Sequence, residues 1–493
     1  MSSVTAAPLE RLLAGVATRI LGDPATTVRS ISIDSRTVRL GDLFFCLRGQ
    51  RVDGHDFAEL AAGAGAAAVV AERELALPRG VAVAIVPDAL AALSIAASRL
   101  YGDPSKDLKL VGVTGTNGKT TTSYLIEAIA EAAGERFGVI GTLGARLGSS
   151  VEPLANTTPF AHDVQRLLAD FREGGARGAV LEVSSHALAL HRLDDVRFDV
   201  AVYTNLTQDH LDFHRTFESY RDAKRTLFAP GAGKGGVRPV AVLNADDAEG
   251  RALAAMVERH ITYAIDAPDA TLRASEIELH PRGARFWVRA LRPAPFELRL
   301  PGKFNVANAL AAMGAACALD FDVEAIAQGL ASVDAVPGRM VSVPAGEIGV
   351  YIDYAHTPDG MEQVLRAVRG LTRGRLLCVF GCGGDRDAGK RPLMGRVAQE
   401  LADVVIITTD NPRHEDPQAI VCAILTGMDI SRAGLEQIPD RAAAIARAID
   451  LARPGDSVLV AGKGHETYQI VGDERRAFSD EAAVRAALAR VVR

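Results

Sequence analysis

The residues best suited to chemistry lie in one glycine-rich segment, residues 113–121, which reads Val-Thr-Gly-Thr-Asn-Gly-Lys-Thr-Thr. An apolar run precedes it and a helix-like run follows, so a strand, a turn and a helix start would place backbone N–H groups around a phosphate. Lys119 would neutralise phosphate charge, and the Thr120 hydroxyl would ligate Mg²⁺. A strict phosphate-loop pattern has glycine where this chain has Val113, and here the glycine is displaced to Gly115. The alternative is an ordinary strand-to-helix turn, but the Gly-Lys-Thr-Thr ending favours a nucleoside triphosphate site.

Other polar residues follow apolar strands. Glu182 lies in the apolar run 179–183, where a carboxylate is costly unless it is paired or bound to a metal. We therefore expect a Mg²⁺ ligand there, with a solvent-facing edge residue as the alternative. Asp209 and His210 follow the next apolar run and predict a polar pocket. By composition alone Lys224 is a surface lysine, because Mg²⁺ would repel an ammonium group.

Two further segments suggest binding. Asp410-Asn-Pro-Arg413 combines a planar bidentate donor, an amide and a rigid proline after a strand, which suits recognition of a carboxylate. A plain turn is the alternative. Asn244-Ala-Asp-Asp247 could contact an adenine or a ribose, although Asn and Asp also favour turns.

The elements that must position these residues alternate between strand and helix, which predicts an α/β fold with three domains. Residues 1–104 would form a small mixed α/β domain that opens with a helix over residues 9–19. Residues 105–335 would form a P-loop-type parallel-sheet domain, with an antiparallel ribbon at about 270–300. Residues 336–493 would form a Rossmann-like, doubly wound domain, in which ligands bind beyond the carboxyl ends of the strands.

Composition narrows the class. The chain has 493 residues, 48% hydrophobic and 24% charged, with a net charge of −6. No long basic block points to nucleic acid or an anionic membrane as a partner. The five cysteines, an odd number in apolar surroundings, predict reduced core thiols. No apolar signal region or run of 18 apolar residues is present, so we expect a cytoplasmic protein, and a monomer by default.

Several motifs taken together resemble the Mur ligases, the ATP-dependent amide-forming enzymes of bacterial peptidoglycan synthesis. The resemblance covers nearly the whole chain in order and rests on residues 115–121, 182–186, 204–206, 209–210, 220–228, 304–308, 337–339 and 353–356. Residues 33–36 and 41–44 are similar to the uridine-binding domain of family members that add meso-diaminopimelate, and Asp410-Asn-Pro-Arg413 resembles their recognition motif.

The resemblance implies a role for each matching residue. The expected ATP contacts are Gly115, Thr116, Asn117, Gly118, Lys119, Thr120, Thr121, Asn308, Arg339 and Asp353. It also reverses the surface interpretation of Lys224, since the matching lysine is carbamylated by CO₂ and a carbamate can bind Mg²⁺. Two Mg²⁺ ions are implied, held by Thr120, Glu182, His210 and carbamylated Lys224. The expected catalytic residues are Lys119, Glu182, His210 and Lys224.

The same resemblance assigns the two other substrate sites. UDP-muramoyl dipeptide contacts are expected at Ile33, Ser35, Gln50, Asn156, Thr157, Thr158, Ser184 and Arg192. Diaminopimelate contacts are expected at Arg386, Asp410, Asn411, Pro412, Arg413, Gly462 and Glu466. One departure is visible: Leu190 stands where the family often has glutamine, so a single substrate hydrogen bond is in doubt.

The implied reaction activates the D-glutamate carboxylate of the UDP-linked dipeptide as an acyl phosphate, which the diaminopimelate amine then attacks. His210 or His356 could take the amine proton. The nearest alternative is a ligase for L-lysine, which Arg413 disfavours because lysine lacks the second carboxylate. Folylpolyglutamate synthase and a regulatory NTPase without ligase chemistry are more distant alternatives.

Overall fold

The computed structural model describes residues 6–49, 52–233 and 236–491. These residues fall into two compact units, each assembled from separate stretches of the chain. The first comprises the described residues up to 114 with 134–202 and 223–241, and the second comprises 115–133, 203–222 and the described residues from 242 onward. The domain boundaries expected at 104 and 335 stay predictions.

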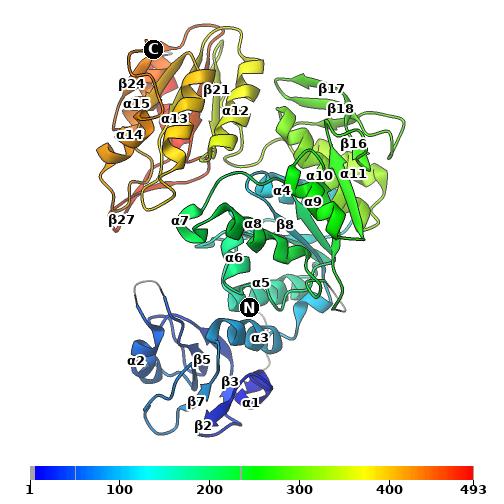
Figure 1. Cartoon of the computed structure of the whole chain (residues 1–493), viewed down its shortest axis with the longest axis vertical. Helices are drawn as coiled ribbons and strands as arrows, with labels where there is room; N and C mark the ends of the chain where they lie inside the picture. Colours follow the sequence, from blue (N-terminus) through cyan, green and yellow to red (C-terminus); the bar gives the residue numbers. More distant parts are fainter. Residues whose placement is uncertain (1–5, 50–51, 234–235, 492–493) are drawn as a thin grey trace. The chain divides into compact units, whose positions relative to one another are not determined.

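The N-terminal part of the first unit, blue in Figure 1, contains a five-stranded sheet in the order β2-β7-β6-β5-β4. Strands β4 to β7 are parallel, and β2 runs antiparallel to β7. In β5, Leu43 and Phe45 enter one core while Phe44 enters another, as strand alternation requires. The strands are β2 (Arg19–Leu21), β4 (Ser30–Ser32), β5 (Asp42–Phe45), β6 (Ala68–Ala71) and β7 (Ala82–Ile85).

Short elements complete this part. A two-stranded ribbon pairs β1 (Ala7–Pro8) with β3 (Thr27–Val28). The helices are α1 (Leu9–Leu12), η1 (Gly54–Phe57), α2 (Ala58–Gly63), α3 (Ala89–Leu100) and η2 (Pro104–Lys106). The helix expected over residues 9–19 is therefore wrong beyond Leu12. The chain turns at Gly15, whose φ is +72°, and Arg19 already pairs with β7.

The rest of the first unit contains six strands of a larger sheet, in the order β11-β10-β9-β12-β8-β13. Strand β12 is parallel to both β8 and β9, whereas β10 pairs antiparallel with β9 and β11. The strands are β8 (Lys109–Thr114), β9 (Phe137–Gly141), β10 (Gly144–Leu147), β11 (Ser150–Glu152), β12 (Gly178–Glu182) and β13 (Val200–Tyr203). The helices here are α5 (Ala161–Glu173), α6 (Ser185–Ala189) and η3 (Thr226–Phe228).

The second unit begins with helix α4 (Lys119–Ala132), which packs against α10 (Lys303–Ala318) and α11 (Val323–Ser332). Strands β14 (Val240–Asn244), which crosses the unit boundary, β15 (His260–Ala264) and β16 (Leu272–Arg273) lie in that order. The predicted antiparallel ribbon is confirmed as β17 (Ser275–His280), β18 (Gly283–Trp287) and β19 (Phe296–Leu298). Three shorter helices are α7 (Leu211–His214), α8 (Phe217–Arg225), which crosses the unit boundary, and α9 (Ala248–Met256).

The C-terminal part of the second unit has a six-stranded sheet in the order β20-β21-β25-β22-β23-β24. All pairs are parallel except that of β20 with β21. The strands are β20 (Val341–Ser342), β21 (Gly349–Asp353), β22 (Leu376–Phe380), β23 (Val404–Ile407), β24 (Leu435–Gln437) and β25 (Ser457–Ala461). A separate hairpin joins β26 (Tyr468–Val471) and β27 (Glu474–Ala477).

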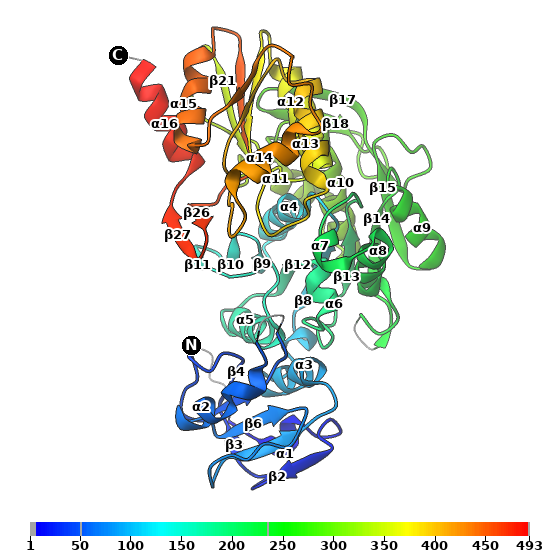
Figure 2. The same ribbon diagram turned by 60° about the vertical axis from the view of Figure 1, so that its left-hand side comes forward.

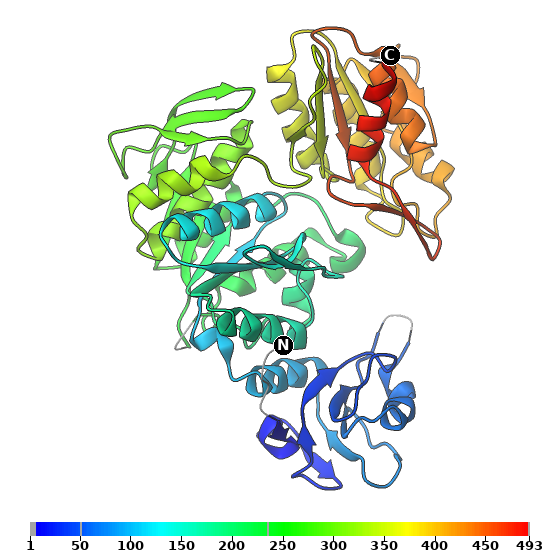
Figure 3. The ribbon, with the colours of Figure 1, turned by 180° about the vertical axis from the view of Figure 1, so that it is seen from behind.

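Helices cover both faces of this sheet, as a doubly wound fold requires. Helices α12 (Pro358–Leu371), α13 (Lys390–Leu401) and α14 (Pro417–Leu425) pack on the face that contains Cys378 and Phe380. Helices α15 (Arg441–Leu451) and α16 (Asp480–Val491) pack on the face that contains Leu377 and Val379. Figure 2 labels the two sets, and Figure 3 shows the red α16 in front of the sheet.

The cysteines are free, and burial raises the thiol pKa of Cys378 and Cys382 to about 12 each, but Cys422 is exposed. Within the described ranges, no helix has both the length and the apolar composition needed to cross a membrane.

Candidate active site

The phosphate loop has the geometry that its sequence predicts. Gly115 and Gly118 have φ values of +144° and +88°, and helix α4 begins at Lys119. A Cβ at Gly118 would overlap Oδ1 of Asn308, and a Cβ at Gly115 would overlap Oγ1 of Thr204. Only glycine fits at both positions, so the displaced glycine of the motif serves the close approach of neighbouring side chains.

Hydrogen bonds hold this loop in place. Thr116 Oγ1 lies 3.0 Å from the Tyr220 hydroxyl and accepts from the Thr207 amide at 3.0 Å. Asn117 donates from Nδ2 to Asp359 Oδ2 at 2.7 Å, at the start of α12. The Lys119 ammonium donates to the carbonyl oxygens of Gly115 and Thr116 at 2.8 Å each. The loop is therefore ordered by its own lysine and by two segments distant in sequence.

A cavity of about 400 Å³ opens beside the loop in the second unit. It brings together seven of the expected ATP contacts: Asn117, Gly118, Thr120, Thr121, Asn308, Arg339 and Asp353. Asn244 and Asp247, which the sequence indicated only weakly, also line it. Phe304 and Tyr354 line it too, and they lie in the motifs 304–308 and 353–356, although no role was expected of them. Tyr263 was not predicted, because it lies in no motif.

Polar contacts fix two of the charged residues of this cavity, Arg339 and Asp353. Arg339 donates from Nη2 to Thr120 Oγ1 at 3.1 Å, and its guanidinium lies 4.7 Å from the centre of the Tyr354 ring. Asp353 accepts from the Met340 and Ala355 amides at 2.7 Å each. Burial raises the pKa of Asp353, although Arg339 and these two bonds act against it. The cavity thus presents the Arg339 cation beside the loop and the buried Asp353 carboxylate.

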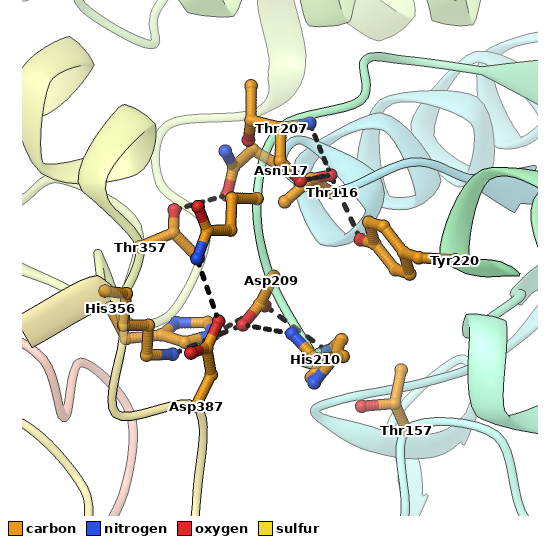
Figure 4. A network of polar contacts seen from close by, with 12 residues as sticks. Thr116, Asn117, Thr157, Thr207, Asp209, His210, Tyr220, His356, Thr357 and Asp387 are labelled. Carbon is orange, nitrogen blue, oxygen red and sulfur yellow. Dashed lines mark hydrogen bonds and ion pairs between the residues drawn. The ribbon is translucent and has the colours of Figure 1, made fainter. Parts of the chain in front are cut away.

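A charged cluster surrounds Asp209 (Figure 4). Its carboxylate lies 3.3 Å from Lys390 Nζ, 3.3 Å from His210 Nε2 and 3.8 Å from His356 Nε2. Burial raises the pKa of Asp209, but the Lys390 ammonium and the two imidazoles outweigh burial and hold it well below its usual range. Lys390 is buried and was not predicted, because nothing in its local sequence distinguishes it from a lysine at a helix start.

His356 has a defined tautomer. Its Nδ1 lies 2.9 Å from the Tyr354 carbonyl oxygen, which can only accept, so Nδ1 carries the proton. Burial and the Lys390 cation lower the pKa of His356 to about 4, although Asp209 raises it. At neutral pH the ring is therefore uncharged, and Nε2 offers a lone pair.

In the first unit, Glu182 ends strand β12 and is only 1% exposed, which excludes the solvent-facing alternative. It accepts from the amide and the hydroxyl of Thr142, at 3.0 Å each, and a Cβ at Gly141 would overlap it. Thr142 Oγ1 also lies 3.1 Å from Thr157 Oγ1. The carboxylate is thus placed by two threonines and a glycine.

The expected contacts to the UDP-linked substrate are partly grouped. Thr158 donates to the Glu182 carbonyl at 2.6 Å and accepts from the Ser184 amide at 3.0 Å. Arg192 donates to the Thr158 carbonyl at 2.7 Å and lies over the Phe160 ring. Asn156 is exposed beside them, Ile33 and Ser35 are half-buried in the N-terminal part, and Gln50 lies outside the described residues.

Lys224 is only 3% exposed, so the interpretation of this residue as a surface lysine is wrong. Among the described residues, no three His, Cys, Asp or Glu side chains group as a metal site. The expected set is of another kind, with a hydroxyl, a carboxylate, an imidazole and a carbamate. The hydroxyl, carboxylate and carbamate oxygens suit Mg²⁺, and the imidazole would add one nitrogen donor. An unmodified ammonium would repel the ion, so the residues fit the metal only if Lys224 is modified.

The expected diaminopimelate residues converge beyond the carboxyl ends of β22, β23 and β25. Arg413 adopts φ +51°, its amide donates to the Ile470 carbonyl at 3.0 Å and its Nη1 donates to the Gly384 carbonyl at 2.7 Å. Burial and the cation of Arg386 lower the pKa of Arg413. Arg386 itself is exposed. A part-buried guanidinium with a second cation beside it marks a place for an anion.

Two charged residues behind this site were missed by sequence reasoning. Lys463 is fully buried and pairs with Glu466 at 2.7 Å. Arg441 is also fully buried and pairs with Asp480, and its Nη1 lies 4.0 Å from Asp410 Oδ2.

Three family models match the chain in order. Residues 27–100 match the Mur ligase family catalytic domain, residues 113–316 the Mur ligase middle domain and residues 338–464 the Mur ligase glutamate ligase domain. The chain belongs to the Mur ligase family. This Mur ligase is 46% identical to the UDP-N-acetylmuramoyl-L-alanyl-D-glutamate–2,6-diaminopimelate ligase of Gloeobacter violaceus, over 98% of each chain. It is also 46% identical to the ligase of that name from Geobacillus thermodenitrificans, over 93% of this chain and 94% of the relative.

Solved structures agree with this assignment. A structure of a UDP-N-acetylmuramoyl-L-alanyl-D-glutamate–2,6-diaminopimelate ligase has 35% identity and a TM-score of 0.67, over 99% of this Mur ligase and 100% of that chain. MurF from Acinetobacter baumannii has a TM-score of 0.70 at 21% identity, over 99% of each chain, and shares the fold.

Proposed function

We propose that this Mur ligase joins meso-2,6-diaminopimelate to the D-glutamate of UDP-N-acetylmuramoyl-L-alanyl-D-glutamate and converts ATP to ADP and phosphate. The names of its relatives support this substrate pair. The single observation that carries it in the structure is the half-buried Arg413 beside the cation of Arg386. A second carboxylate on the incoming amino acid would pair with this charge, whereas L-lysine would leave it unpaired.

The reaction has two steps. A γ-carboxylate oxygen of the D-glutamate attacks the γ-phosphorus of ATP, an O–P bond forms and the bond to ADP breaks. The amine of diaminopimelate then attacks the acyl carbon, a C–N bond forms, and the C–O bond to phosphate breaks. Both substrates of the first step are anions, so neutralising and positioning charge is the main task of the site.

The chain's residues divide this task. The loop from Gly115 to Thr121 and the Lys119 ammonium bind the phosphates of ATP. Asn308, Arg339 and Asp353 contact the nucleotide in the adjoining cavity. The expected contacts of the UDP-linked dipeptide are Ile33, Ser35, Gln50, Asn156, Thr157, Thr158, Ser184 and Arg192, and those of diaminopimelate are Arg386, Asp410, Asn411, Pro412, Arg413, Gly462 and Glu466.

Magnesium completes the proposed site. Thr120, Glu182, His210 and Lys224 as its carbamate would hold the metal. When bound, Mg²⁺ offsets the repulsion between the attacking carboxylate and the triphosphate. Carbamylation supplies the anion that a lysine lacks, and the burial of Lys224 supports a role inside the protein over a role on the surface.

The attacking amine must lose a proton, and we assign this role to His356 rather than His210. The Tyr354 carbonyl holds the proton of His356 on Nδ1, which leaves Nε2 as the acceptor. The lowered pKa keeps this ring uncharged at neutral pH. His210 is instead expected on the metal. Because ATP and nucleotide-linked precursors are cytoplasmic, we expect the reaction to take place in the cytoplasm. We also expect the enzyme to act as a monomer.

The deciding experiment measures phosphate release with each substrate omitted in turn. We expect release to require ATP, the UDP-linked dipeptide and meso-diaminopimelate, with L-lysine supporting little turnover in a parallel assay. Turnover with lysine equal to that with diaminopimelate would overturn the role of Arg413. Hydrolysis of ATP without either acceptor would instead indicate a regulatory NTPase.

A further inference from the structure

Lys463 is a fully buried lysine in the third of the loops that form the amino-acid site. It follows strand β25, between Gly462 and Gly464, and its side chain is 0% exposed. Its ammonium donates to Asn411 Oδ1 at 3.0 Å and to Glu466 Oε2 at 2.7 Å. A buried ammonium costs several kcal/mol unless it is paired and hydrogen-bonded, and an apolar side chain would fill the same space at no such cost. The residue therefore calls for a role beyond packing.

Lys463 is one of three groups that agree on the orientation of Asn411. An ammonium group can only donate, so the oxygen of the Asn411 amide must face Lys463. That oxygen also accepts from the Ile470 amide at 3.0 Å. The amide nitrogen is thereby turned toward Glu466, and Nδ2 donates to Oε2 at 2.9 Å. The Ile470 amide and the Glu466 carboxylate require this same orientation, so the distinct effect of Lys463 is on Glu466.

The same contacts determine which oxygen of Glu466 remains available. Oε2 accepts from both Lys463 and Asn411, whereas Oε1 accepts no hydrogen bond from any described residue. Lys463 therefore ties down one carboxylate oxygen and leaves the other for a ligand. Arg413 lies in the same group of loops and is coupled electrostatically to Glu466.

We infer that Lys463 is a positioning residue that holds Glu466 through its Oε2, so that Glu466 Oε1 accepts from the ammonium group at the far end of the incoming amino acid. This inference rests on the proposed function. In it, Arg413 selects the far carboxylate of the diamino dicarboxylic acid, and Lys463, through Glu466, selects the far ammonium group.

The test compares meso-diaminopimelate with 2-aminopimelate, which keeps the far carboxylate and lacks the far amine. In Lys463→Met we expect kcat/KM for diaminopimelate to fall by about 10- to 100-fold, mainly through KM, the amount typical of a lost hydrogen bond to a charged group. The kcat/KM for 2-aminopimelate should change little. The ratio of kcat/KM for diaminopimelate to that for 2-aminopimelate should therefore be smaller in Lys463→Met than in the wild type. KM for ATP should be unchanged.

A double-mutant cycle separates positioning from general stability. If Lys463 acts through Glu466, then Lys463→Met/Glu466→Gln should be no more defective with diaminopimelate than Glu466→Gln alone. Asp456→Asn is the matched control, because it breaks the Arg375–Asp456 ion pair at the opposite end of the same sheet. It should lower Tm without changing the ratio between the two amino acids.

The inference is overturned if Lys463→Met lowers turnover with both amino acids equally and in proportion to its loss of Tm. It is also overturned if the losses of kcat/KM caused by Lys463→Met and Glu466→Gln multiply in the double variant. Failure of the proposed function looks different, because the wild-type enzyme itself would then show no requirement for diaminopimelate.

Discussion

Asn117, in the middle of the phosphate loop, donates a hydrogen bond of 2.7 Å to Asp359, more than 200 residues later at the start of α12. Thr357, the N-cap of that helix, lies 3.4 Å from the other end of the same amide. The loop is therefore held by the start of a helix that packs on the C-terminal sheet, and both belong to one compact unit.

This bond should influence nucleotide binding. Asp359→Ala removes the acceptor and leaves the Asn117 amide unpaired in a part-buried position, so we expect KM for ATP to rise by about 10-fold. Asp359→Asn keeps an oxygen acceptor, so its KM for ATP should lie between those of the wild type and Asp359→Ala. Initial-rate kinetics with ATP varied would measure this, and equal KM values in all three proteins would contradict it.

Gly118 should tolerate no side chain. Gly118→Ala places a Cβ against Asn308 and forces a φ of +88° on an L-residue, so we expect loss of nucleotide binding. Gly134→Ala is the control, since φ there is +76° but nothing lies within 4 Å of the new Cβ. Calorimetric titration with an ATP analogue should show binding to the control alone. Equal binding to both would show that the close approach is unimportant.

Modification of Lys224 can be tested by chemical rescue. Lys224→Ala should lower kcat by on the order of 100-fold or more, because the carbamate that would hold Mg²⁺ beside the phosphates is lost. Added formate or acetate should restore part of the activity. Lys106→Ala, which changes an exposed lysine, should behave like the wild type. The mass of one bound CO₂ on the native protein would support the carbamate, and full activity of the Lys224 variant would refute it.

Arg413 should govern the choice of amino acid. Arg413→Met should raise KM for diaminopimelate by about 100-fold, as expected when one partner of a part-buried charge pair is removed. Arg413→Lys should recover only part of this loss, since an ammonium cannot pair bidentately with a carboxylate. Steady-state assays with diaminopimelate and L-lysine in parallel would test it, and an unchanged preference would reject the assignment.

Two histidines should make the fold sensitive to mild acid. Burial, followed by nearby cations, lowers the pKa of both His356 and His465 to about 4, against an ordinary value of about 6.5. Between these values the unfolded chain binds protons that the folded protein does not, so stability falls as pH falls through this window.

The measurement is Tm against pH from 7 to 4.5. His356→Gln and His465→Gln should each flatten the decline. His414 has the opposite sign, because hydrogen bonds to Asp385 and Asp473 raise its pKa and stabilise the fold at low pH. His414→Gln should therefore steepen the decline. Curves of Tm against pH that are parallel for the wild type and all three variants would contradict the assigned pKa shifts of these histidines.

Local chemistry explains which features the sequence predicted. Near-continuous apolar runs identified the buried parallel strands, and alternation at about 270–300 identified the antiparallel ribbon. The phosphate loop was predictable because strand, glycine turn and helix start are contiguous. The first helix was predicted to end too late, because the pairing of Arg19 with β7 depends on a strand more than 60 residues later.

The contiguous elements and motifs, together with the family, were therefore predictable from the sequence. The contact of Lys390 with Asp209, and that of Lys463 with Asn411, emerged with the folded structure. So did the burial of Lys224 and Glu182. The charge state, orientation and burial of a side chain depend on partners that folding brings from distant segments, which no local pattern encodes.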